Sequence, residues 1–177
     1  GQSSVDDAAA LQGLLEKEWQ AKAGQDANAP ISESAVLISQ YQRIRLDTNS
    51  LCNTLEIEDF GLQAMPEVSP PKWHLAHTTW FFETFILKPF ARQYTAFHPR
   101  YEVLFNSYYN GVGEQYLRSH RGLLSRPTVQ EVFDYREYVD HAMYELLSQT
   151  GHPEYQEITK RCELGLNHEQ QHQELLC

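Results

Sequence analysis

The chain has few cysteines and no long hydrophobic run, and each scarcity excludes a class of protein. Only three of its 177 residues are cysteines, Cys52, Cys162 and Cys177. They are far apart and not in CxxC spacing, so the sequence predicts neither a disulfide framework nor a thiolate zinc site. No apolar stretch approaches the roughly 18–20 residues of a membrane span, and no signal peptide is visible. We therefore expect a reduced, cytoplasmic protein that does not enter membranes.

Positive charge is also scarce. The chain has 14 lysines and arginines against 24 aspartates and glutamates, which gives a net charge of −10. An acidic surface repels phosphate groups, which argues against nucleic acids and anionic membranes as partners. The hydrophobic fraction of 41% is ordinary for a globular protein, and the length suits one domain with its own core.

The strand-like alternation of apolar and polar residues is nearly absent, so we expect an all-α protein. The pattern predicts an N-terminal helix and linker over residues 1–30, followed by a helical bundle over residues 31–177. On the first helix of this bundle, Arg43, Arg45 and Asp47 are expected to lie largely on the exposed side. Helices are predicted over 4–23, 32–55, 72–87 and 128–149, and from Pro153 to the end of the chain, in up-and-down order.

Capping residues support these boundaries. Ser69 is expected to cap the helix that begins with two prolines, and Pro89 to stop it. Thr128 and Glu131 have the spacing of a capping box. The long irregular connection over residues 90–127 lies between these helices, and such long loops in a compact domain usually carry function.

Four histidines on two helices are candidate metal ligands. His168 and His172 are four residues apart, which places both imidazoles on one helix face. With eight histidines in the chain, one pair at this spacing can arise by chance, so the pair alone is weak evidence for a metal site. His74 and His77 lie on a helix that is apolar almost all round, where a buried imidazole needs a partner. The pair and one of these two would give three neutral nitrogen ligands and leave coordination positions open for catalysis.

Residues 168–172 also read HExxH, the zinc metallopeptidase string in which the glutamate is a general base. Those enzymes commonly take their third ligand from downstream, and this chain ends five residues after His172. Gly165, one turn before His168, either permits close backbone approach or is unremarkable. Glu169 points off the face that carries the two histidines, so we expect it to support an imidazole or to be a surface charge.

Two segments together carry a resemblance to a known family. They are SPPKWHLAHTTWFFE over residues 69–83 and LNHEQQHQELL over residues 166–176. The chain from about residue 35 to 177 resembles the N-terminal DinB-like domain of EgtB-type sulfoxide synthases, the iron(II)-dependent enzymes of ergothioneine biosynthesis, to which ovothiol synthases are related. The resemblance implies a DinB-like four-helix bundle that binds Fe(II).

The resemblance implies that His77, His168 and His172 bind the iron, with His74 left to packing or to support of a ligand. It implies that hercynine, a cysteine-type thiol and O2 are joined into a C–S bond with a sulfoxide. Gln171 is then expected to orient the substrate imidazole.

The irregular connection supplies further candidates. One of Tyr108 and Tyr109 is a candidate proton donor near bound O2. Arg118 and Arg121, three residues apart, are candidates for clamping the carboxylate of the sulfur donor.

The end of the chain lacks the glycine or basic last turn that usually closes a helix, so we expect the polypeptide to continue. The resemblance implies that a C-terminal domain similar to formylglycine-generating enzymes, or a second fragment of the enzyme, completes the substrate pocket. A zinc-dependent DinB-type thiol transferase and a non-catalytic helical module stay open as alternatives, because zinc binds three histidines equally well.

Overall fold

A computed structural model describes residues 32–53, 55, 57–62, 70–106 and 126–176. These residues are mostly helical and contain no strand, which confirms the all-α prediction. The predicted N-terminal helix over 4–23 lies outside the described residues, so the division at residue 30 stays a prediction. None of the described helices has the length and apolar character that a membrane crossing requires.

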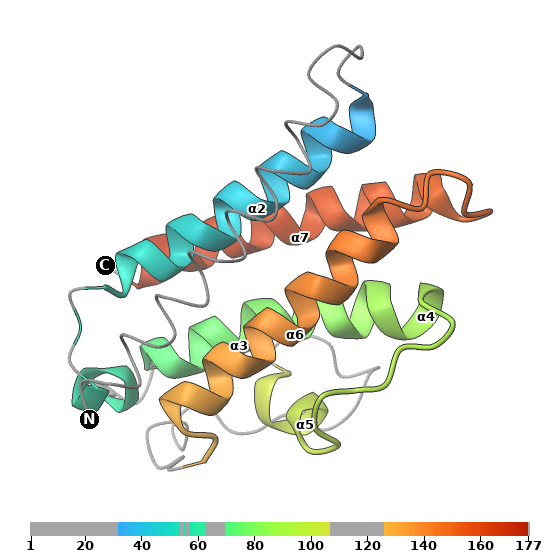
Figure 1. Cartoon of the computed structure of the whole chain (residues 1–177). Helices are drawn as coiled ribbons and strands as arrows, with labels where there is room; N and C mark the ends of the chain where they lie inside the picture. The colour runs from blue at the N-terminus through green and yellow to red at the C-terminus, as the bar shows by residue number, and fades with distance from the viewer. Residues whose placement is uncertain (1–31, 54, 56, 63–69, 107–125, 177) are drawn as a thin grey trace.

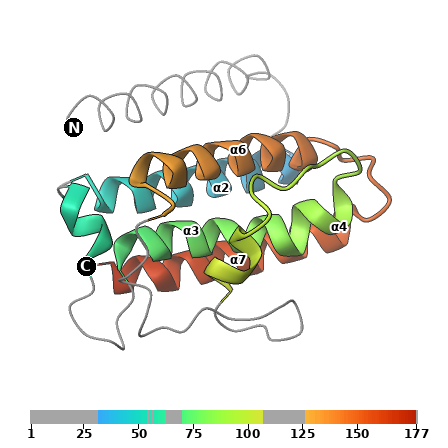
Figure 2. The same ribbon diagram turned by 90° about the horizontal axis from the view of Figure 1, so that it is seen from below.

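Four long helical segments form two layers in the described part of the chain. Helices α2 (Glu33–Leu51) and α6 (Val129–Leu147) form one layer, and α3 (Pro71–Phe82) and α7 (Tyr155–Leu175) form the other (Figure 2). The short 3-10 helix η1 (Ile57–Gly61) follows α2, and α5 (Tyr101–Phe105) lies in the connection after α3. The core between the layers is rich in aromatic side chains, including Tyr41, Trp73, Trp80, Phe82 and Tyr135.

The order of helix directions differs from the up-and-down prediction. Figure 1 shows α3 and α6 running in the same direction, with α2 and α7 running the opposite way. The connection between residues 91 and 128 is long enough to return along the whole bundle before α6 begins. A short loop would have forced antiparallel neighbours, so the length of this connection explains the difference.

The helix starts follow from local chemistry. Ser32 caps α2 by accepting a hydrogen bond from the backbone N–H of Ala35 at 3.2 Å. Thr128 caps α6 in the same way, with the N–H of Glu131 as donor at 3.2 Å. For α3, however, the N-cap position belongs to Pro70, whose extended backbone leads into Pro71, and the predicted cap Ser69 lies outside the described residues.

Pro89 does not stop its helix where it was expected to. Helix α3 continues through a π-helical turn, η2 (Glu83–Leu87), into α4 (Lys88–Phe90), which contains Pro89. Proline has no N–H to offer the carbonyl four residues earlier, here that of Phe85. The guanidinium of Arg161 on α7 donates to this carbonyl at 2.9 Å instead. A side chain of α7 thus replaces the missing backbone bond and ties the two helices together.

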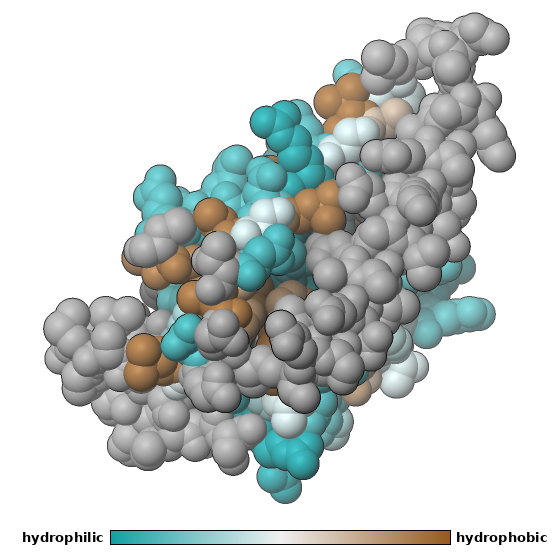
Figure 3. Space-filling view, turned by 60° about the vertical axis from the view of Figure 1, so that its left-hand side comes forward, coloured by the Kyte–Doolittle hydropathy of each residue, from teal (hydrophilic) through white to brown (hydrophobic). Residues whose placement is uncertain are grey.

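The surface in Figure 3 has hydrophobic side chains interspersed with hydrophilic ones over the described part of that face. Apolar side chains scattered singly among polar ones are normal on protein surfaces. The two cysteines in the described residues, Cys52 and Cys162, are both buried thiols.

Candidate metal centre

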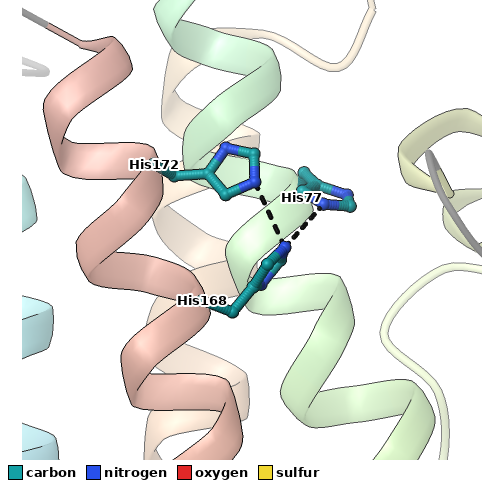
Figure 4. A group of neighbouring side chains, drawn as sticks. All are labelled: His77, His168 and His172. Atoms are coloured by element: carbon teal, nitrogen blue, oxygen red, sulfur yellow. Dashed lines mark hydrogen bonds between the residues drawn. The ribbon is translucent and has the colours of Figure 1, made fainter.

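Three histidines from the two helices of one layer converge on a point between α3 and α7. His77 comes from α3, and His168 and His172 come from successive turns of α7 (Figure 4). The Nε2 atom of His168 lies 3.2 Å from that of His77 and 3.1 Å from that of His172. His77 and His172 are buried, and His168 is partly exposed.

The distances suit a metal ion. For metal–nitrogen bonds of about 2.1 Å, two nitrogens this far apart subtend an angle of about 95–100° at the metal. Both angles lie between the octahedral and tetrahedral values, and the ligand atoms of all three residues lie within 4.8 Å of one another, so the group could hold a metal ion. Imidazole suits zinc, copper, iron and nickel alike, and the donor set leaves the identity of the metal open.

His77 is held by two indole rings. Trp73 and Trp80 are four residues before and three residues after it, so all three rings share one face of α3. The His77 ring stacks on Trp73 with centroids 4.4 Å apart and on Trp80 with centroids 5.4 Å apart. This sandwich fixes the plane of the imidazole.

The short helix α5 supplies a hydrogen-bond acceptor for Nδ1 of the His77 ring. Nδ1 of His77 donates to the backbone carbonyl of Phe105, and the indole N–H of Trp73 donates to the carbonyl of Leu104 at 3.2 Å. These are carbonyls of the last turn of α5, which have no partner within the helix. Because Nδ1 of His77 carries the proton, its Nε2 presents a lone pair to the cluster.

His74 performs a similar task for His172. Their Nδ1 atoms are 2.7 Å apart, so one of the two carries the shared proton. When His172 is the donor, its Nε2 presents a lone pair to the cluster. His74 therefore supports a ligand and leaves the group of three as the candidate donor set.

Two imidazoles of the site, those of His77 and His168, are electrically neutral at pH 7. Burial lowers the pKa of His77 well below its ordinary value, and the neighbouring His172 and His168 lower it further. Burial also lowers the pKa of His168 to about 4, although the nearby Glu169 acts in the opposite direction. Metals bind the neutral imidazole, so no proton has to be removed from these two ligands.

Gly165 lets the two ligand helices approach closely. A Cβ atom at this position would lie 2.6 Å from Cε1 of Phe82 and 2.8 Å from Cε1 of Phe81. The ring of Phe81 in turn contacts that of His168, with centroids 5.1 Å apart. Of the two interpretations of Gly165, the structure supports close approach.

Glu169 and Arg45 are placed differently from their predicted positions. Glu169 was expected to support an imidazole or to be a surface charge, and Arg45 to be exposed. Both are buried, and Nη1 of Arg45 donates to Oε1 of Glu169 at 3.1 Å. Burial alone would raise the pKa of Glu169, but Arg45 and Arg136 lower it below its ordinary value. The carboxylate therefore stays ionised inside the bundle, where a helix-face pattern alone predicts a solvated charge.

Of the other predicted site residues, the structure describes Gln171 alone. Gln171 is exposed on α7, next to His172. The two tyrosines and two arginines of the irregular connection, Tyr108, Tyr109, Arg118 and Arg121, lie outside the described residues.

The residues that sequence reasoning missed are Phe105 and the ion partners of Glu169. A backbone carbonyl carries no side-chain signal, and a lone arginine in an amphipathic helix resembles a surface residue. Comparison of the chain with protein-family models and with curated proteins gave no match.

Proposed function

We propose that the chain is the iron(II)-binding domain of an O2-dependent sulfoxide synthase that joins hercynine to cysteine or γ-glutamylcysteine, as in ergothioneine biosynthesis. The observation that carries the proposal is the convergence of three imidazoles from the two segments that resemble this family. Nε2 of His168 lies within 3.2 Å of the Nε2 atoms of the other two.

The iron would supply a site at which thiol, substrate imidazole and O2 are held together. The reaction balances without a further reductant. The C–H and S–H bonds break and a C–S bond forms, one oxygen atom ends in the sulfoxide, and the other leaves as water with the two hydrogens. All four electrons taken up by O2 come from the two organic substrates.

The chain contributes an all-nitrogen donor set. Three neutral ligands leave the full positive charge of the metal uncompensated, which favours binding of a thiolate and lowers the pKa of the bound thiol. The stacked indoles of Trp73 and Trp80 and the carbonyl of Phe105 hold His77 without any change of protonation. This rigidity suits a site that must keep its geometry while substrates enter.

Residues beside the cluster are assigned to the substrates. At 100° per residue, Gln171 lies about 80° around α7 from the centre of the ligand face, on the exposed side. Its amide is suited to hydrogen bond with the substrate imidazole. Arg118 and Arg121 are assigned to the carboxylate of the sulfur donor, and Tyr108 or Tyr109 to proton donation. A further domain or second fragment is proposed to complete the pocket.

Two alternatives have specific consequences. Three histidines suit zinc equally well, so a zinc-dependent thiol transferase that consumes no O2 is the second candidate. The metallopeptidase interpretation requires Glu169 as general base. A carboxylate that is 0% exposed and bound to two guanidinium groups cannot reach a metal-bound water, which argues against that interpretation.

The test is metal-dependent product formation. The chain, together with the further domain or second fragment that completes the pocket, is loaded with Fe(II) without oxygen. It is then given hercynine, cysteine or γ-glutamylcysteine, and O2, with O2 uptake and product mass as readouts. His77→Ala, His168→Ala and His172→Ala are expected to abolish iron retention, whereas His141→Ala, at an exposed position of α6, should retain it. Full iron content in all three ligand variants would overturn the site. A zinc-loaded chain that transfers thiols without O2 uptake would favour the second candidate.

A further inference from the structure

A buried cluster of three charged residues lies directly beside the metal centre. We call Arg45, Arg136 and Glu169 the inner ion cluster. Oε1 of Glu169 accepts from Nη1 of Arg45 and from Nη2 of Arg136, each at 3.1 Å. It also accepts from Oγ1 of Thr48 at 3.0 Å. These three donors come from α2 and α6, the two helices that carry no histidine of the metal centre, and the hydroxyl of Thr78 on α3 lies 3.5 Å from the same oxygen.

The same cluster reaches α3 beside its histidine. Thr78 directly follows His77, and its hydroxyl accepts from Nη1 of Arg136 at 3.2 Å. The next residue, Thr79, accepts from Nη2 of Arg45 at 2.7 Å. On α7, Glu169 directly follows His168. Each of the two ligand-bearing helices therefore has, immediately after a ligand, a residue bound into the inner ion cluster.

The position of Glu169 on α7 determines which motion of this helix the inner ion cluster opposes. At 100° per residue, Glu169 lies about 80° around α7 from the centre of the face that carries His168 and His172. A carboxylate fixed from two other helices therefore opposes rotation of α7 about its axis. Metal ligands need to be held within about 0.5 Å and 10–20° of their productive geometry. A small rotation of α7 would exceed that tolerance.

We propose that Glu169 is a positioning residue of the metal centre. Through the inner ion cluster it fixes the rotation of α7 and its spacing from α3, and so holds the three Nε2 atoms at metal-binding distances. The inference rests on the proposed metal centre but not on the identity of the metal or on the sulfoxide synthase reaction. It also gives the glutamate of the HExxH string a role that is unrelated to general-base chemistry.

A matched control is present in the same network. Asp140 on α6 accepts from Nε of Arg45 at 2.8 Å and from the hydroxyl of Tyr41, and it also carries one negative charge. It joins α2 to α6 only, and neither helix bears a ligand. Glu169→Gln and Asp140→Asn thus remove the same charge from Arg45, but only the first releases a ligand helix.

The experiment measures Co(II) affinity by competition with a chelator and the visible absorption spectrum of bound Co(II), for the whole chain. Outer partners of metal ligands typically change affinity 10–100-fold when removed. Glu169→Gln is expected to weaken Co(II) binding at least tenfold and to change the spectrum. Asp140→Asn is expected to stay within about threefold of the unaltered chain with the same spectrum, although both lower the thermal midpoint.

A second pair of variants covers the case in which Glu169→Gln does not fold. Thr78→Val removes one of the two threonine hydroxyls that link the cluster to α3, and Thr84→Val is a control at a threonine outside the cluster. Thr78→Val is expected to weaken Co(II) binding about threefold to tenfold, with Thr84→Val unchanged.

Two results would overturn the inference. One is a folded Glu169→Gln chain with unaltered Co(II) affinity and spectrum; the other, where that variant is unfolded, is equal affinity in the two threonine variants. Failure of the proposed function gives a different result. An unaltered chain that binds Co(II) through its histidines but forms no C–S product with Fe(II), even with the further domain or second fragment present, rejects the reaction and leaves the positioning role standing. A chain that binds no Co(II) rejects the metal centre and the positioning role together.

Discussion

The imidazoles of His74 and His172 meet across the interface between α3 and α7, with their Nδ1 atoms 2.7 Å apart. One ring can donate only if the other accepts. When His74 accepts, Nδ1 of His172 carries the proton and its Nε2 presents a lone pair to the cluster, so the proposed ligand role of His172 depends on His74.

Replacement of His74 tests this dependence. His74→Phe keeps the volume of the ring and removes the hydrogen bond, so Co(II) or Zn(II) affinity should fall about 10–100-fold while the three ligands remain. Competition with a chelator measures the loss, and His141→Phe serves as control at an exposed position. Affinity equal to that of the unaltered chain would show that His74 only fills space.

Substitution of Gly165 tests the close approach of the ligand helices. Alanine gains about 1 kcal/mol of helix propensity over glycine. The new Cβ meets the buried rings of Phe81 and Phe82, and such overpacking costs about 1–3 kcal/mol. We expect a net loss in the free energy of unfolding of about 1 kcal/mol, measured by urea titration, together with weaker metal binding through the contact of Phe81 with His168.

Gly151→Ala is the control for that experiment, because a Cβ at residue 151 meets nothing within 4 Å. It should change the free energy of unfolding by less than about 0.5 kcal/mol. Equal effects of the two substitutions would contradict the packing explanation.

The metal-free chain should lose stability as the pH falls from about 6.5 to 5. In the unfolded chain a histidine binds its proton near pH 6.5. In the folded chain the pKa of His168 is about 4 and that of His77 is also well below the ordinary value. The unfolded state therefore binds more protons across this range, so falling pH favours unfolding, and above pH 6.5 the contribution is constant.

The expected loss for the two histidines together is on the order of 2 kcal/mol by pH 5, after allowance for the partial exposure of His168. Urea midpoints at pH 7, 6 and 5 measure it. The pH dependence should shrink in His168→Phe, which has no group to titrate. A slope that is the same in this variant would assign the effect to other residues.

A second buried carboxylate, that of Glu83, leads to a prediction about the free energy of unfolding. Glu83, in the π-helical turn η2, accepts from the hydroxyls of Tyr94 and Tyr135, the latter at 3.0 Å. Tyr135→Phe leaves the carboxylate with one donor fewer inside the protein, which should cost about 1–3 kcal/mol in the free energy of unfolding.

The control is Tyr138→Phe, one turn later on α6, whose hydroxyl donates to the backbone carbonyl of Thr95 at an exposed position. It should cost less than about 1 kcal/mol. Equal losses in urea titrations of the two variants would show that the burial of Glu83 does not increase the contribution of the Tyr135–Glu83 hydrogen bond to the free energy of unfolding.

Much of the fold and part of the site could be predicted from local pattern. Helical periodicity predicts the all-α class, and Ser32 and Thr128 cap their helices because an oxygen lies in reach of the first backbone N–H groups. The spacing of His168 and His172 places them on one face. The resemblance selects His77 over His74, and the structure brings His77 together with the other two.

What local pattern missed depends on contacts between distant segments. Arg45 appears exposed by helix periodicity, yet it is buried because Asp140 and Glu169, 95 and 124 residues away, neutralise it. The direction of α6 depends on the length of the preceding connection, which a count of helices does not include. The carbonyl of Phe105 is invisible to any side-chain motif.

The inner ion cluster also has a consequence for the order in which the chain is made. Arg136 precedes Glu169 by 33 residues and Arg45 precedes it by 124. During synthesis, α2, α3 and α6 leave the ribosome with two arginines whose shared carboxylate does not yet exist, and Asp140 can pair with Arg45 only. Burial of the remaining uncompensated charge of Arg136 is costly, which opposes closure of the core until α7 arrives. Completion of the bundle and assembly of the metal centre then become one late event, and nascent chains arrested before residue 165 should remain sensitive to protease.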